Sequence, residues 1–154
     1  MAFLNSMDIS GSALTASRLR MDVISENIAN AETTRTEKGG PYRRKMVVYE
    51  PQSRQGTPSF QSMLDSEVSA SSSDPDQQFG GVKVAAIVDD PTQFTQVYDP
   101  TSPDANTEGY VQKPNVDIVK ETLDMMSVSR AYTANINALN AVKTMASKAL
   151  EMGK

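Results

Sequence analysis

The sequence predicts an α+β fold that is mainly α, in which long N- and C-terminal helices pack against each other as a coiled coil and the hydrophobic core is small. A small central β-hairpin or antiparallel sheet with a mobile Ser-rich loop completes it. Three observations predict this fold: apolar residues repeat at helical spacing near the N-terminus, residues 115–152 contain neither Pro nor Gly, and the middle of the chain is rich in strand-forming types. We divide the 154 residues into an N-terminal helical region at 1–38, a central β-rich segment at 39–112 and a C-terminal helical region at 113–154.

Residues 7–31 are predicted to form the first helix. Apolar side chains recur every seven residues along one line: Met7, Leu14, Met21 and Ile28, with Ile24 beside them. A second line with the same spacing starts two positions later: Ile9, Ala16 and Val23. Because two residues turn a helix by about 200°, the two lines lie on opposite sides, so both flanks of this helix are expected to be apolar.

The central segment is predicted to contain strands at 42–50 and 82–88, with a possible third strand at 94–98. Gly-Gly pairs at 39–40 and 80–81, before the first and second of these strands, are typical of turns. Between the first two strands, residues 53–79 are rich in Ser and poor in large apolar side chains, which predicts a mobile surface loop with at most a helical turn at 60–64.

Residues 115–152 are predicted to form the second long helix, about 54 Å in length. Asn115 is the expected N-cap, and Asp117 lies in the first turn, where the helix dipole favours an anion. This helix also has two faces. One face carries Met125, Val128, Ile136, Leu139, Ala146 and Leu150, and the opposite face carries Ala134, Ala138, Ala141 and Met145.

Composition excludes several classes of function. The chain has no Cys and no His, which rules out thiol nucleophiles, imidazole bases, Cys/His zinc sites and disulfides. Its net charge of -4, with scattered basic residues, argues against a nucleic-acid partner. The cluster Arg43 to Lys45 is interpreted as a solvated strand edge. The acidic pairs are interpreted as solvated turns: Asp65 and Glu67, Asp74 and Asp76, and Asp89 and Asp90. We expect no metal, no cofactor and no enzymatic activity.

The first residues are not expected to be a cleaved secretory signal, because no cation precedes Arg18 and polar residues interrupt the apolar ones. No stretch approaches the roughly 20 apolar residues of a membrane-spanning helix, so direct membrane insertion is not expected.

The apolar faces leave two interpretations open. An ordinary helical hairpin would bury one line of each helix, whereas opposed second lines favour cover by neighbouring subunits. Contacts between different surfaces of identical subunits generate open helical assemblies unless they close, although a trimeric coiled coil or a four-helix dimer would use the same faces. Asn135 is interpreted as a buried polar side chain whose hydrogen bonds are satisfied and which can fix the register of the helices. Tyr132 is interpreted as an aromatic side chain that packs in the core.

Two segments resemble one family closely. Residues 7–36, with the motif Ala29, Asn30, Thr33, resemble the N-terminal signature of bacterial flagellar rod and hook proteins. Residues 109–145, with Tyr110 to Asp117 and the block from Arg130 to Asn135, resemble the matching C-terminal signature. The short chain and the segments at 80–88 and 98–111 are similar to the proximal-rod branch, although the Ser-rich stretch at 53–78 is longer than the usual linker.

The resemblance implies a structural subunit of the proximal rod, the axial drive shaft that carries torque from motor to hook. It implies export through the flagellar type III apparatus without signal cleavage, and location in the basal body across the periplasm. Implied partners are other proximal- and distal-rod proteins, copies of itself, the inner-membrane ring or rod adaptor and the export apparatus. Fourteen residues are the candidate interface residues: Met7, Leu14, Met21, Ile24, Ile28, Asn30, Met125, Val128, Tyr132, Asn135, Ile136, Leu139, Val142 and Ala146.

The alternative function is a soluble helical adaptor or an export chaperone of the flagellar system, which would be a defined oligomer with folded termini. A rod subunit should instead be largely monomeric with protease-labile ends. A hydrolase is not supported, because the sequence contains neither a nucleophile-elbow motif nor a candidate base. Changing Leu139 to Asp is expected to abolish motility while expression is retained.

Overall fold

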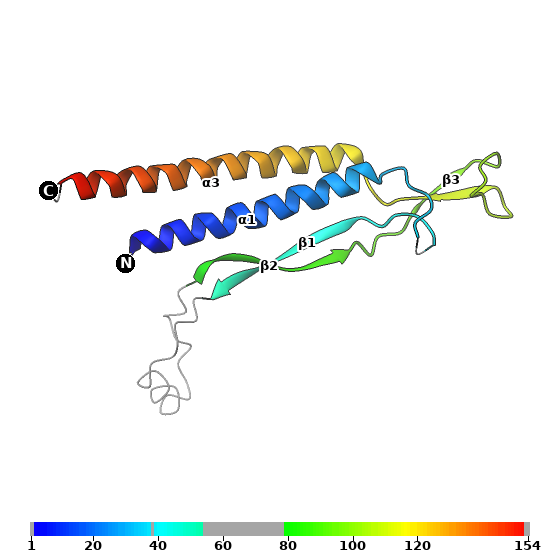
Figure 1. The fold of residues 1–154 in the computed structure, drawn as a ribbon. Helices are drawn as coiled ribbons and strands as arrows, with labels where there is room; N and C mark the ends of the chain where they lie inside the picture. The colour runs from blue at the N-terminus through cyan, green and yellow to red at the C-terminus, as the bar shows by residue number, and fades with distance from the viewer. Residues whose placement is uncertain (1, 38, 54–78, 153–154) are drawn as a thin grey trace, which may run out of the picture.

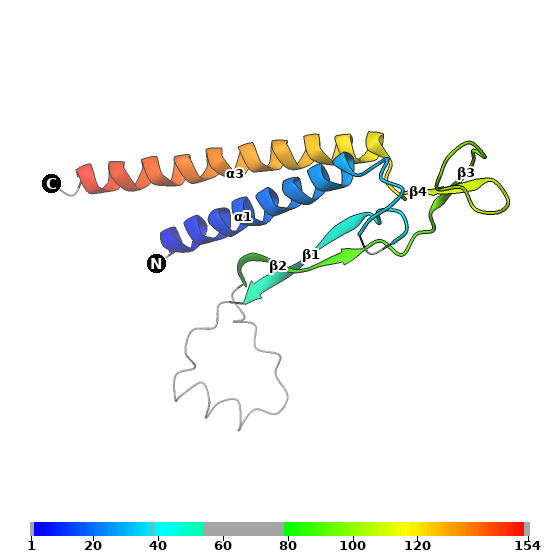
Figure 2. The same cartoon turned by 45° about the vertical axis from the view of Figure 1, so that its right-hand side comes forward.

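The computed structural model describes residues 2–37, 39–53 and 79–152, and its main feature is an antiparallel pair of long helices (Figure 1). Helix α1 (Ala2–Ala29) and helix α3 (Ile118–Met152) lie side by side in both ribbon views, and both termini lie at the same end of the pair (Figures 1 and 2). Two small antiparallel sheets complete the fold. The predicted class, α+β and mainly α with paired terminal helices, is confirmed.

Both helices begin at residues other than those predicted. Helix α1 extends back to Ala2 and ends at Ala29, two residues before the predicted end. Helix α3 begins at Ile118, because Asp117 and not Asn115 caps it: the Asp117 Oδ1 accepts from the backbone N–H groups of Val119 at 3.0 Å and Lys120 at 3.4 Å. The prediction of Asn115 as the N-cap is therefore wrong.

The first sheet is a long two-stranded ribbon that packs under α1 (Figure 1). Strand β1 (Lys45–Ser53) pairs antiparallel with β2 (Phe79–Asp89), and the register joins Lys45 to Asp89 at one end and Ser53 to Phe79 at the other. The predicted pairing of two central strands is confirmed, although β1 starts three residues later than expected. The mobile loop was predicted at 53–79, but Ser53 and Phe79 pair as strand ends. The rest of it, 54–78 with the predicted helical turn, lies outside the described residues.

The second sheet is a short hairpin beyond the end of the helix pair opposite the two termini (Figure 1), and it does not join the first one. The predicted third strand at 94–98 is present as β3 (Thr95–Tyr98), but it pairs with β4 (Tyr110–Lys113) and not with the ribbon. The Asp99 N–H donates to the Gly109 carbonyl at 3.0 Å, and the rings of Tyr98 and Tyr110 meet edge to face with centroids 5.3 Å apart. These local contacts favour pairing within 95–113 over pairing with the ribbon.

The ribbon covers one of the two apolar lines of α1. Ala16 and Val23 are buried, whereas Ile9, on the same line, is exposed. The Ser12 Oγ accepts from the Val82 N–H at 3.1 Å, and Gly81 approaches Ser12 so closely that an added Cβ would lie 2.2 Å from its Oγ. On α1, the second apolar line therefore needs little cover from a neighbouring subunit, which corrects the expectation from spacing alone.

Candidate assembly interface

The seam between the helices is formed by a regular line of side chains on α3. These residues follow one another at alternating intervals of four and three, as in a coiled coil, and all are buried or half-buried: Glu121, Met125, Val128, Tyr132, Asn135, Leu139, Val142 and Ala146. Their neighbours at 122, 123, 126, 127, 129 and 130 are exposed. Within a single chain this line faces α1.

Most candidate interface residues lie on this seam. On α1, Ile24 is buried, and Met7, Leu14, Met21 and Ile28 are half-buried. On α3, Val128 is buried and the other candidates, including Ile136, are half-buried. The structure brings them together inside one subunit, and their part in contacts between subunits stays a prediction.

Asn30 lies past the end of α1, away from the seam. Its Nδ2 donates to the Glu26 carbonyl at 2.9 Å, and its Oδ1 accepts from the Thr33 hydroxyl at 3.2 Å. Backbone bonds from Asn30 to Glu26 and from Thr33 to Asn30 continue the same turn. The motif of Ala29, Asn30 and Thr33 therefore ends the helix and turns the chain toward β1.

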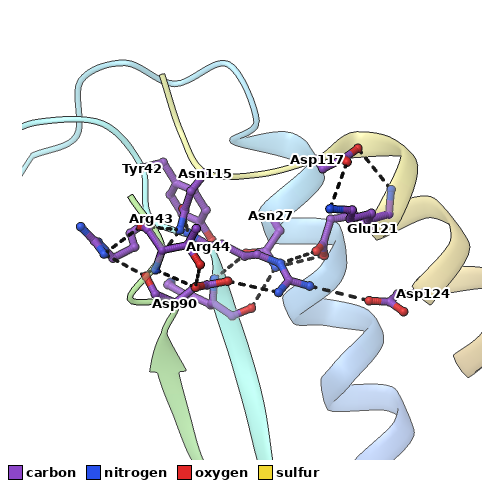
Figure 3. Close-up of polar contacts among 12 residues, drawn as sticks. Asn27, Tyr42, Arg43, Arg44, Asp90, Asn115, Asp117, Glu121 and Asp124 are labelled. Carbon is purple, nitrogen blue, oxygen red and sulfur yellow. Dashed lines mark hydrogen bonds and ion pairs between the residues drawn. The ribbon is translucent and has the colours of Figure 1, made fainter. Parts of the chain in front are cut away.

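A cluster of polar side chains, which we call the polar hub, joins four segments where α3 begins (Figure 3). Its members come from α1, the linker before β1, the segment after β2 and the start of α3: Asn27, Tyr42, Arg44, Asp90, Asn115 and Glu121. Asn27 and Glu121 are each only 1% exposed. Among the described residues, no buried side-chain nitrogen or oxygen lacks a hydrogen-bond partner.

Asn27 uses all four hydrogen bonds that its amide can make. The Oδ1 accepts from the Tyr42 hydroxyl at 3.0 Å and from the Lys45 N–H at 2.9 Å. The Nδ2 donates to the Lys45 carbonyl at 2.9 Å and to the Glu121 Oε2 at 3.1 Å. The side chain thus pairs with Lys45 as a neighbouring strand would, and ties α1 to β1 and α3 at one point.

Arg44 is the cation of the hub. Its Nε donates to the Glu121 Oε1 at 2.6 Å, and its guanidinium also lies 3.4 Å from Asp90 and 3.7 Å from Asp124. Its backbone is fixed as well, because its N–H donates to the Asn115 Oδ1 at 2.8 Å and its carbonyl accepts from the Asp90 N–H at 2.8 Å. Figure 3 shows Arg44 between the carboxylates of Asp90, Glu121 and Asp124.

Tyr42 and Asp90 of the hub have shifted pKa values. Burial, followed by the negative charges of Glu26, Asp89 and Glu121, raises the pKa of Tyr42 to about 12. The hydroxyl and backbone N–H of Thr92 donate to Asp90 and hold its pKa below the ordinary range against the opposing effect of burial, and Arg44 lowers it by a smaller amount.

The hub overturns two interpretations of the sequence. Arg44 is not on a solvated strand edge, and neither is Arg43, which donates to the Asp90 carbonyl at 2.9 Å and lies over the Phe94 ring at 4.4 Å. Asp90 is not in a freely solvated turn. Sequence reasoning also missed Asn27 and Glu121. A usable signal existed for Glu121, since it lies seven residues before Val128 on the seam line, where a charged residue needs a partner.

The side of α3 that points away from α1 is exposed and apolar, and we call it the outer face. Val119, Leu123, Met126 and Met145 are between 46% and 69% exposed, and Ala134, Ala138 and Ala141 lie exposed between them. On α3, unlike α1, the predicted second face has no cover from the described part of the chain. Large apolar side chains exposed together on one side of a helix are typical of interaction sites.

The described residues show no metal site and no membrane span. Across 2–37, 39–53 and 79–152, no three Asp or Glu side chains gather closely enough to hold a metal ion. Neither long helix, over its described length, has a window apolar enough to cross a membrane.

Comparisons with known proteins identify the class. Residues 7–35 match the family model described as "Flagella basal body rod protein", and residues 107–152 match "Flagellar basal body rod FlgEFG protein C-terminal". These two matches cover most of α1 and all of α3, which places the chain among flagellar rod proteins.

The curated relatives define the family more narrowly. The chain is 50% identical over 158 aligned residues to the flagellar basal-body rod protein FlgC of Bacillus subtilis, and 42% identical over 154 residues to that of Salmonella typhimurium, covering all of both chains in each case. It is 40% identical to FlgC of Borreliella burgdorferi over 97% of each chain. The chain therefore belongs to the FlgC family of flagellar basal-body rod proteins, as the resemblance of its termini predicted.

Proposed function

We propose that this chain is a structural subunit of the proximal rod of the bacterial flagellum and has no enzymatic activity. The observation that carries the proposal is full-length similarity to FlgC relatives, in a chain whose α3 has an uncovered apolar outer face. In the rod, neighbouring subunits would cover this face. A contact between the outer face and a different surface of the next subunit is heterologous, so it would propagate into a helical array.

The proposed mechanism is mechanical. A drive shaft must resist bending and twisting while it carries torque from motor to hook. Long helices packed against one another resist both, because any bend has to open many close contacts at once. The length of α3, 35 residues, gives each subunit an extended line along which to make such contacts.

The proposal extends to partners and location. The family name supports assembly with other rod proteins and with copies of the chain. We further propose contacts with the inner-membrane ring or rod adaptor, and delivery through the type III export apparatus without signal cleavage into a rod that spans the periplasm. The halves of both helices nearer the chain termini contain no buried side chain among the described residues. This supports the proposal that the two ends of the chain become ordered only when the subunit is incorporated into the rod.

Deletion of the gene followed by electron microscopy of basal bodies tests the function as a whole. We expect the inner ring to be retained and the rod to be lost. Intact rods in the deletion strain would contradict the assignment as a rod subunit.

Substitution of Leu123 by Asp tests the outer face. Leu123 is 57% exposed in the single chain, so Leu123→Asp should leave the fold intact but abolish swimming, because a charge would be buried between subunits. Leu139→Asp is a less specific test, since Leu139 lies on the seam within one chain. Ser129→Asp adds the same charge at another exposed position of α3 and is the matched control. Normal swimming by Leu123→Asp would show that the outer face is not covered.

A further inference from the structure

Glu121 occupies a position on the seam where an apolar side chain would be expected. It precedes Met125 and Val128 on the line that faces α1, and it is 1% exposed. A carboxylate enclosed between two helices is strongly unfavourable unless a cation and hydrogen-bond donors compensate it. Pairing of α1 with α3 at this end therefore depends on what reaches Glu121.

The compensating groups do not come from the helices alone. Asn27 of α1 donates one hydrogen bond to Glu121, but the cation is Arg44, which belongs to the linker before β1. Within the described chain, no other basic side chain lies within ion-pair distance of Glu121. The helices by themselves would thus bury a carboxylate without its countercharge.

Arg44 reaches Glu121 only when the linker is docked. The Arg44 backbone is held by Asn115 and by the Asp90 N–H, and Lys45 is held on both its N–H and its carbonyl by Asn27. Without the docked linker, the Asn27 amide also loses three of its four partners, those supplied by Tyr42 and Lys45. Two polar groups on the seam, one from each helix, would then be buried and uncompensated.

We propose that Glu121 makes the pairing of α1 with α3 conditional on docking of residues 42–45. The linker and the ribbon that follows it must be in place before the helices close at the hub end. The steps of folding thereby follow a fixed order. The apolar faces of the two helices do not pack against each other at this end until the β segment is in place. This inference concerns the single chain and does not depend on the proposed function.

The test compares hydrogen exchange in the full chain with that in three variants: Arg44→Ala, Glu121→Gln and the double variant. In Arg44→Ala we expect exchange to rise on the order of 100-fold in the hub halves of both helices, at 16–29 and 118–132, because the carboxylate loses its cation. The double variant should recover protection in both helices to within about tenfold of the parent, since a neutral Gln still bonds Asn27 and needs no cation. Glu121→Gln alone should pair its helices as the parent does.

Two results would overturn the proposal. One is a double variant that exchanges as fast as Arg44→Ala, which would mean that Arg44 acts through contacts other than the charge of Glu121. The other is a loss of protection in Arg44→Ala confined to the linker and the strand ends. If Arg44→Ala loses its helical circular dichroism altogether, recovery of that signal in the double variant supports the proposal, and failure to recover it refutes it. Lys83→Ala breaks the exposed pair with Glu50 and is the matched control, expected to change nothing.

Discussion

The two ends of the α1 and α3 pair are built on different principles. At the hub end, Asn27, Arg44 and Glu121 are bonded to one another or to the backbone, and the buried residues of the helices gather there, from Ala16 to Asn27 and from Glu121 to Val128. At the distal end, where both termini lie, no described side chain of residues 5–15 or 132–152 is buried. The same heptad pattern runs through both ends. The difference shows that the heptad pattern alone does not produce buried side chains, which occur where the hub ties the helices to the β segment.

The largest difference in stability between the two ends is expected when an Asn is replaced by Ala at each of them. Asn27→Ala should lower the free energy of unfolding by about 3 kcal/mol or more, because it removes one hydrogen bond each from the Glu121 carboxylate, the Tyr42 hydroxyl and both backbone groups of Lys45. Asn135→Ala, at a half-buried seam position of the distal end, should change it by less than about 1 kcal/mol. Urea unfolding followed by circular dichroism measures both. Equal losses would remove the distinction between the two ends.

A smaller effect is expected where the ribbon meets α1. Gly81 has φ +127° and touches Ser12, so Gly81→Val should strain the backbone, push the ribbon away and cost about 1–3 kcal/mol. Limited proteolysis should then cut β2 faster than in the parent chain. Gly11→Ala is the control, since no other atom lies within 4 Å of its added Cβ, and it should be neutral or stabilising by up to about 1 kcal/mol. Undiminished protection of β2 in Gly81→Val would show that the close approach to Ser12 is not needed.

The smallest effect concerns the pH dependence of the hub. The pKa of Tyr42 is raised to about 12, above the value of about 10 in an unfolded chain, so folding favours the protonated phenol. The resulting stabilisation is complete below pH 10 and is lost as the pH rises toward 12. In a titration of tyrosinate absorbance, one of the five Tyr residues should ionise near 12, and Tyr42→Phe should remove that phase. The absence of a phase near 12 would contradict burial of Tyr42.

Periodic features of the fold could be predicted from sequence, whereas features that depend on distant partners could not. The spacing from Met7 to Ile28 and the uninterrupted run before Met152 predicted both helices, because a helix is defined by local repetition. The strands of the ribbon were predicted from their strand-forming residue types, which are also a local feature. Strand residue types do not specify a partner, so the strand at 94–98 was predicted without its partner β4 and without its separation from the ribbon.

The candidate interface shows the same limit. Spacing identified the seam and the outer face of α3, since both follow from helix geometry. It could not show that Ala16 and Val23 are covered by the ribbon of the same chain. Nor could it place the hub, where Asn27 meets Glu121 across 94 residues of sequence and the polar types involved are usually solvated.

The most direct test of the central claim, that a neighbour covers the outer face of α3, uses a single cysteine in a chain that has none. In the isolated subunit Leu123→Cys should react rapidly with a maleimide, and in assembled basal bodies it should be protected. Thr107→Cys, in the exposed turn between β3 and β4, reports the general access of the reagent. Protection of Cys at 123 on assembly, beyond any change at 107, is the predicted result. Equal reactivity at 123 in the free and assembled states would contradict the account.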